Sequence, residues 1–84
     1  MFWVYIIFSQ RLDRYYTGHS ENIEVRLWEH NAGISKFTSK ASDWVLVYSE
    51  IHPNRELARR REMEIKKKKS RRYIEWIIAG APGS

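Results

Sequence analysis

The run of residues 2–9 constrains the fold more than any other part of the chain. Apolar side chains occupy both alternating sets of its positions, Phe2, Val4, Ile6 and Phe8 on one side and Trp3, Tyr5 and Ile7 on the other. Successive side chains of a strand point to opposite faces, so a strand of this kind must be covered on both faces. The run therefore predicts the central strand of a sheet.

The length of the chain predicts a single compact domain over residues 1–79, followed by a short tail over residues 80–84. The chain has 84 residues and no cysteine, so packing must supply its stability without disulfides or thiolate metal sites. The absence of cysteine favours a cytoplasmic location. Residues 1–8 lack a basic leader and are too short for an export signal, and we expect no membrane association.

The remaining elements follow from turn and cap signals. A polar stretch over residues 9–14 predicts a hairpin loop, and residues 15–18 predict the next strand. Three helices are expected, together with a third strand over residues 44–51. The helices cover residues 21–32, capped by Ser20 or Asn22 and ended by Gly33, residues 55–68 after Asn54, and a short segment after Ser70. The fold class is α/β (α+β), with a three-stranded antiparallel sheet flanked by helices.

Positive charge is concentrated near the C-terminus. The chain carries a net charge of +5, while residues 55–72 hold ten basic and three acidic side chains, a local net of +7 that leaves −2 elsewhere. Such a surface suits a phosphate backbone, because each neutralised phosphate releases counterions. A solvated helical face explains the same pattern equally well.

Five side chains are candidates for a reactive site. Tyr5 and Tyr16 lie on neighbouring predicted strands, and the register decides whether they share a face. Arg26 and His30 are four residues apart and border an apolar helical stripe. Glu62 occupies an inward helical position, where a carboxylate needs a partner. Packing tyrosines, pairing of Arg26 or His30 with Glu29, and an Arg26–Glu62 ion pair are the structural alternatives.

Other polar and aromatic residues carry simpler expectations. His19 and His52 lack metal-ligand spacing to any other residue, and we expect them in surface loops. The tryptophans are spread over four elements, which predicts core positions rather than a stacking platform for bases. These tryptophans are Trp3, Trp28, Trp44 and Trp76.

The order of these motifs resembles the GIY-YIG nuclease superfamily, in particular its small stand-alone members. The motifs are Val4-Tyr5-Ile6, Tyr16-Thr17-Gly18, residues 26–31, residues 33–38 and residues 61–66, and the resemblance covers about residues 2–78. Val4 and Thr17 replace a glycine and an isoleucine of the family's name-giving tripeptides, and both suit strands. No Asn follows Asn54, so the late amide that some members place near the metal has no counterpart.

The resemblance implies a Mg²⁺-dependent endonuclease acting on DNA, in which Mn²⁺ can substitute. Glu62 would bind the metal, Arg26 would clamp the phosphate and Tyr5 would act as general base. Tyr16 would position the attacking water or the phosphate. His30 would hydrogen-bond a tyrosine or accept the proton itself. The expected nucleic-acid contacts are Arg14, Lys36, Thr38, Arg59, Lys66, Lys67, Lys69 and Arg71.

Backbone contacts of this kind carry little sequence information, so we expect low sequence specificity and strong salt sensitivity. Single-stranded and branched DNA are candidate substrates, and DNA shape, a partner protein or self-association would supply specificity. The main alternative is a catalytically weak or inactive nucleic-acid-binding module of the same fold. A third reading is an interaction domain that makes no nucleic-acid contact.

Overall fold

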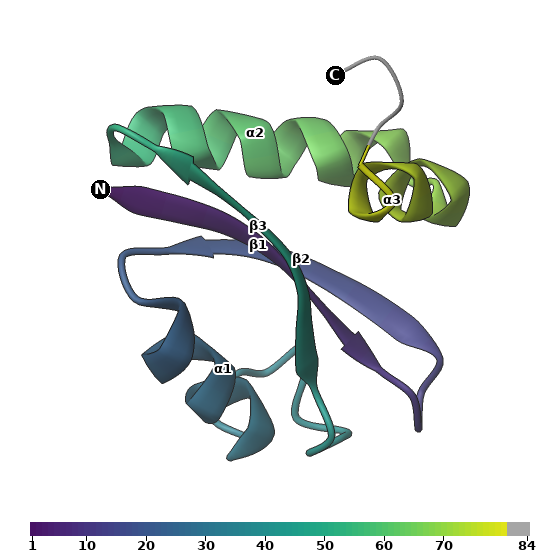
Figure 1. Ribbon diagram of the computed structural model, residues 1–84. Helices are drawn as coiled ribbons and strands as arrows, with labels where there is room; N and C mark the ends of the chain where they lie inside the picture. Colours follow the sequence, from purple (N-terminus) through teal and green to yellow (C-terminus); the bar gives the residue numbers. More distant parts are fainter. Residues whose placement is uncertain (81–84) are drawn as a thin grey trace.

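A three-stranded antiparallel sheet forms the centre of the computed structural model, which describes residues 1–80 (Figure 1). The spatial order is β2-β1-β3, so the first strand is central, as predicted. The strands are β1 (Phe2–Ser9), β2 (Arg14–Ser20) and β3 (Val45–His52). Of the predicted tail, residues 81–84 lie outside the described residues.

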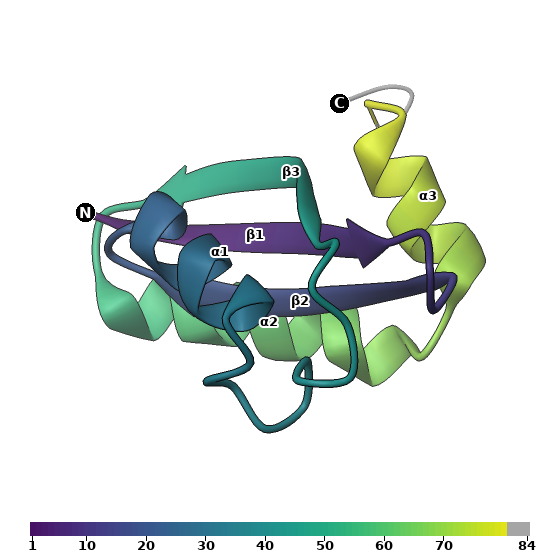
Figure 2. The same cartoon turned by 90° about the horizontal axis from the view of Figure 1, so that it is seen from below.

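Helices cover both faces of the sheet. One face carries α1 (Ile23–Asn31), and the other carries α2 (Arg55–Lys68) and α3 (Arg71–Ile78) (Figures 1 and 2). The alternation of β1 supplies both layers. Val4 packs against Ala58 and Ile65 on the side of α2, while Tyr5 belongs to the opposite cluster with Ile7 and Trp44. The continuous apolar run of β1 thus reflects a strand that is buried on both faces.

Each helix begins at a residue whose side chain caps it. Asn22, Asn54 and Ser70 accept hydrogen bonds from the backbone N–H three residues later, at 2.9–3.1 Å. Of the two predicted caps for α1, the structure selects Asn22. This helix therefore begins two residues later than predicted and ends at Asn31. Lys69 ends α2 in the left-handed conformation, with φ of 49°.

Two of the tryptophans do not lie in the core. Trp44 is buried, but Trp28 is 65% exposed and Trp76 is 44% exposed, so the expectation of four core tryptophans was wrong for this pair. Both lie on short helices that cover the sheet with only one face. Helical spacing alone does not say which flank of a one-sided apolar stripe meets the sheet.

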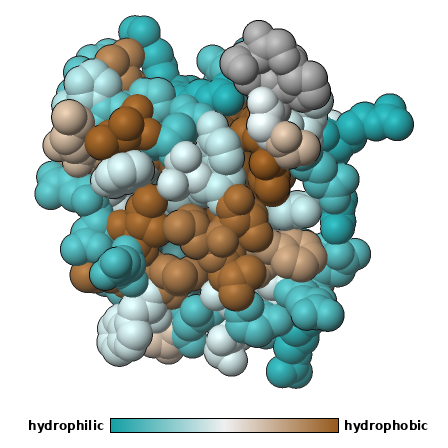
Figure 3. Space-filling model, in the orientation of Figure 1, coloured by the Kyte–Doolittle hydropathy of each residue, from teal (hydrophilic) through white to brown (hydrophobic). Residues whose placement is uncertain are grey.

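An apolar area marks the face of the molecule seen in Figure 3, where brown surface near the middle is surrounded by hydrophilic side chains. The edge strand β3 contributes to the exposed apolar surface through Val45, Leu46 and Ile51. Among the described residues, no helix is both long enough and apolar enough to cross a bilayer.

Candidate catalytic site at the edge of β2

Tyr5 and Tyr16 share one face of the sheet. Tyr5 pairs with Gly18, and Tyr16 lies two residues before Gly18 on the same strand. Both side chains therefore project toward α1, where they belong to the same apolar cluster. Gly18 leaves space for the Tyr5 ring to lie across β2, since a Cβ atom at Gly18 would be 2.5 Å from the Tyr5 hydroxyl oxygen.

His30 joins the two tyrosines from α1. Its side chain is fully buried, with Nε2 2.8 Å from the Tyr5 hydroxyl and Nδ1 2.6 Å from the Thr38 Oγ1. The ring also packs edge-on against Tyr16, with the ring centroids 5.1 Å apart. Burial, assisted by the charge of Arg26, lowers the pKa of His30 to about 4. A neutral imidazole thus links Tyr5 to Thr38 in one hydrogen-bonded chain.

The structure corrects the placement of Thr38. We expected a surface phosphate contact, but its side chain has 0% exposure and its hydroxyl is bound to His30. The Thr38 carbonyl accepts a hydrogen bond from Trp44 Nε1 at 3.0 Å, and this bond ties the loop that contains Thr38 to a buried side chain. Thr38 therefore positions the imidazole rather than meeting solvent.

The burial of His30 predicts a measurable loss of stability in acid. Its pKa is about 4 in the folded protein, against an ordinary value of 6.5 for a solvated histidine, so between these values the unfolded chain binds the additional proton. Stability therefore falls as pH drops through this window, by about 2 kcal/mol between about pH 7.5 and about pH 5. Urea unfolding at both pH values measures the change.

His30→Gln is the matched variant for this measurement, because glutamine stays neutral and all carboxylates remain. Its stability should depend less on pH across the same window. Equal pH dependence in the two proteins would contradict a buried neutral imidazole.

Arg26 lies beside Tyr5 at the solvent boundary. Burial raises the pKa of Tyr5 far above its ordinary value, and the Arg26 guanidinium opposes part of that shift. Arg26 is half-buried and bonds Glu29 at 2.9 Å, as one structural alternative anticipated. It also lines an open hollow of about 400 Å³ at the end of β2. The other lining residues are Phe2, His19, Ser20, Glu21 and Arg55.

Glu62 approaches from the opposite side of the sheet. Its helix, α2, covers the face away from α1, whereas the two tyrosines project toward α1. Glu62 is connected to the tyrosines around the free edge of β2, through Lys66. Lys66 Nζ lies 2.6 Å from Glu62 Oε2 and 5.1 Å from the centroid of the Tyr16 ring. The carboxylate also contributes to the raised pKa of Tyr5.

The partners of Glu62 differ from those considered in the sequence. An ion pair with Arg26 was the structural alternative, but the carboxylate instead meets Lys66 and His19 Nδ1, the latter at 2.5 Å from Oε1. His19 lies on β2 and not in a loop, and His52 lies on β3 bonded to Glu50 at 2.6 Å. The expectation of surface loop positions for both histidines was therefore wrong.

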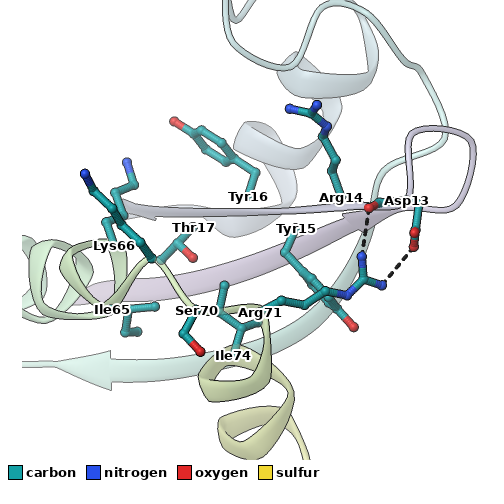
Figure 4. A pocket seen from close by; sticks show the side chains of 11 residues that line it. Asp13, Arg14, Tyr15, Tyr16, Thr17, Ile65, Lys66, Ser70, Arg71 and Ile74 are labelled. Carbon is teal, nitrogen blue, oxygen red and sulfur yellow. Dashed lines mark hydrogen bonds and ion pairs between the residues drawn. The ribbon is translucent and has the colours of Figure 1, made fainter.

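One stripe of α2 brings positive charge to the β2 edge. The stripe consists of Arg55, Arg59, Glu62 and Lys66, at spacings of four, three and four residues, and the cap residue Lys69 follows it. Arg55 lines the hollow beside Arg26. We did not predict that Arg55 lies near the site, although the helical spacing that predicted the position of Glu62 also places Arg55 on the same side of α2. Lys66 and Lys69 line a second hollow of about 420 Å³ with Arg14 and Tyr16 (Figure 4).

The remaining predicted contacts fall into two groups. Within the described residues, Arg14, Lys36, Arg59, Lys67 and Lys69 are exposed and form no ion pair with another side chain. Arg71 is different, because its guanidinium bonds Asp13 at 2.8 Å (Figure 4) and Glu75 at 3.2 Å. A phosphate group would have to displace these carboxylates, so Arg71 has a structural role in closing the hairpin against α3.

Comparison with known proteins places this arrangement in context. The family model for the GIY-YIG catalytic domain matches residues 1–74. A UPF0213 protein of Staphylococcus haemolyticus is 46% identical over 52 residues, which cover 61% of this chain and 63% of that protein. The match thus spans less than two thirds of this curated relative. The solution NMR structure of a UPF0213 protein from Bacillus halodurans has a TM-score of 0.59 at 30% identity, over 99% of this chain and 88% of that chain.

Proposed function

Because this chain belongs to the GIY-YIG family, whose domain has a nuclease-type fold, we propose that it is a divalent-metal-dependent endonuclease that hydrolyses phosphodiester bonds in DNA. The proposal rests on one observation. Hydrogen bonds link the side chains of Tyr5, His30 and Thr38 in series, and Arg26 and Tyr16 lie next to them. A buried, fully bonded imidazole against a phenol beside a half-exposed guanidinium is suited to moving a proton next to a bound phosphate.

Arg26 would bind the scissile phosphate in the hollow that it lines. A guanidinium stays charged at all relevant pH values, and its planar donors match two phosphate oxygens. Glu29 holds the guanidinium at 2.9 Å and orients it. Tyr16, packed against the imidazole, would position the attacking water or the phosphate.

Tyr5 and His30 would act together as the proton acceptor. Since the pKa of Tyr5 is raised by burial, its hydroxyl is protonated in the free protein and cannot be the base alone. In our proposal the Tyr5 hydroxyl donates to His30 Nε2, and the Nδ1–H donates to Thr38 Oγ1. Tyr5 then accepts the proton of the attacking water as its own proton moves to Nε2, and the negative charge that develops on the attacked phosphate would offset the low pKa of His30 in the free protein.

Glu62 would hold the divalent ion. Its carboxylate is 14% exposed, and one of its two partners is the ammonium of Lys66, a long side chain with 44% exposure. A carboxylate with a replaceable surface cation fits a metal that keeps most of its waters, as Mg²⁺ does and as Mn²⁺ can. When bound, the ion would supply charge stabilisation for the phosphate oxygens.

The basic stripe of α2 and the free cations Arg14, Lys36 and Lys67 would supply affinity for the nucleic-acid backbone. DNA is the proposed substrate, with single-stranded and branched forms among the candidates, and low sequence specificity is expected because nothing in these contacts reads base edges. We propose a cytoplasmic protein whose specificity comes from DNA shape, a partner protein or self-association.

Removal of the metal tests the proposal directly. We expect cleavage of single-stranded, duplex or branched DNA with Mg²⁺ or Mn²⁺, none with a chelator, and recovery when metal is restored in excess. The reason is that the phosphate oxygens lose several kcal/mol of charge stabilisation without the ion. Gel assays of labelled substrates measure the effect. Cutting that survives the chelator would assign the activity to something other than this site.

A nucleic-acid-binding module with little or no turnover is the second candidate. The observation that favours it is that both oxygens of Glu62 already have partners, His19 and Lys66. This function predicts DNA binding that falls with salt but no cleavage of any of the three substrates with either metal.

A further inference from the structure

His19 lies against the carboxylate to which the proposed function assigns the metal. Its Nδ1 is 2.5 Å from Glu62 Oε1, and both side chains are largely buried, at 26% and 14% exposure. His19 pairs with Val4 across the sheet, so its side chain projects on the face covered by α2. It also lines the hollow that contains Arg26. His19 thus lies between Glu62 and the space proposed for the phosphate.

A second histidine–carboxylate pair in this chain shows how a closed, structural arrangement differs. His52 Nε2 lies 2.6 Å from Glu50 Oε2, a contact almost as short as that of His19. Glu50, however, also accepts from the Tyr48 hydroxyl at 2.6 Å and from the Arg61 guanidinium at 3.1 Å. Arg61 is itself held by Glu64 and Tyr73. The Arg61 guanidinium therefore cannot move away from Glu50 without breaking its bonds to Glu64 and Tyr73 as well.

The cation at Glu62 is held much less firmly. Lys66 is 44% exposed and contacts Glu62 at 2.6 Å through a flexible stem whose ammonium solvent can reach. A dication or a nearby phosphate group can therefore draw the ammonium away. What remains is a carboxylate oxygen and an imidazole nitrogen side by side.

The separation of these two atoms suits a shared ion. Neighbouring ligands of an ion with bonds of about 2.1 Å lie about 3 Å apart, so the observed 2.5 Å must widen by about 0.5 Å when a metal takes the place of the direct contact. Among the described residues, no three His, Cys, Asp or Glu side chains form a metal-binding group. A two-residue site would leave positions open for water and phosphate oxygens.

We propose that His19 is a second protein ligand of the divalent ion at Glu62, and that this makes the site select Mn²⁺ and similar transition-metal ions over Mg²⁺. The inference rests on the proposed role of Glu62. Its chemical reason is that imidazole nitrogen is a good ligand for transition metals, whereas Mg²⁺ prefers oxygen.

Metal titration of the complete chain without DNA tests this assignment. Mn²⁺ binding is followed by the loss of the free Mn²⁺ signal in electron paramagnetic resonance, and Mg²⁺ binding by calorimetry. We expect His19→Ala to weaken Mn²⁺ binding by about tenfold to a hundredfold and to leave the weaker Mg²⁺ binding within about twofold. His52→Ala is the matched control and should bind both ions as the wild type does.

Pulsed electron paramagnetic resonance of the Mn²⁺ complex detects directly whether an imidazole nitrogen is bound to the metal. A coordinated imidazole should produce ¹⁴N modulation in the wild type and in His52→Ala but not in His19→Ala. His19→Asn, which keeps a hydrogen-bond donor near Glu62, should also lack it, and thermal melting shows whether each variant is folded.

The possible failures separate the two proposals. Unchanged Mn²⁺ affinity in both folded His19 variants, or wild-type complexes without ¹⁴N modulation, would overturn the role of His19. If Glu62→Gln still abolished binding, the proposed function would stand. If no Mn²⁺ bound up to low millimolar concentrations, the role of His19 would be overturned. If metal binding survived Glu62→Gln, the roles of both His19 and Glu62 in binding the metal would be overturned.

Discussion

Glu62→Gln should reduce metal-dependent DNA cleavage by about a thousandfold or more while leaving the protein folded. Glutamine keeps the volume of the side chain but removes the charge that holds a divalent ion. Losing several kcal/mol of transition-state stabilisation corresponds to a change of this size, because each 1.36 kcal/mol is tenfold in rate. Single-turnover cleavage at saturating metal measures it.

Glu56→Gln is the control for this variant. It removes the same charge from the same helix, but its side chain is 75% exposed and its contact with Arg60 is a loose 3.8 Å. We expect near wild-type cleavage. Glu56→Gln should unfold close to the wild-type temperature, since exposed pairs contribute only about 0–1 kcal/mol, and thermal melting shows whether Glu62→Gln is folded as well. Cleavage by Glu62→Gln within tenfold of wild type would show that this carboxylate does not hold the metal.

Gly18→Ala should both destabilise the fold and impair cleavage. The added Cβ would lie 2.5 Å from the Tyr5 hydroxyl oxygen and 2.7 Å from Tyr5 Cζ, closer than such contacts occur. The ring cannot turn aside freely, because it is 1% exposed and its hydroxyl is bonded to His30. We expect a loss of about 1–3 kcal/mol in the free energy of unfolding.

The same clash displaces Tyr5 from its position beside Arg26. Misplacing a reacting group by about 1 Å can reduce the rate about a hundredfold, so cleavage should fall by that order. Urea unfolding and single-turnover cleavage measure the two effects.

A double-mutant cycle identifies the cause. In a Tyr5→Leu background the aromatic ring is absent, and Gly18→Ala should cost much less stability than it does in the wild type. Equal costs in the two backgrounds would mean that the strand, and not the tyrosine ring, requires glycine at this position.

Local signals in the sequence predicted most of the fold. Asn54 and Ser70 were identified as caps and act as caps, since such an interaction involves a side chain and a backbone group only three residues away. The central place of β1 followed from its apolar residues on both faces. The order of the motifs indicated the GIY-YIG family and its nuclease-type fold, and the comparison with known proteins confirmed both.

Three placements could not be predicted in this way. Thr38 reads as part of a polar loop, yet its hydroxyl is needed to bond the second nitrogen of a buried imidazole. Arg71 reads as a free cation, yet Asp13, 58 residues away, neutralises it. His19 has no metal-ligand spacing to any residue, because its partner is 43 residues away on a helix.

Local sequence patterns predict which segments become strands and helices, where two of the helices begin, and which side chains have the chemistry for phosphodiester cleavage. They can do so because caps and alternation depend on neighbours along the chain. Folding brings Tyr5, Tyr16 and His30 together, places Glu62 around the edge of β2, and sets His19 against it, and no local pattern predicts these contacts. Those contacts depend on strand register and on the seating of α2, which the packing of the whole core sets.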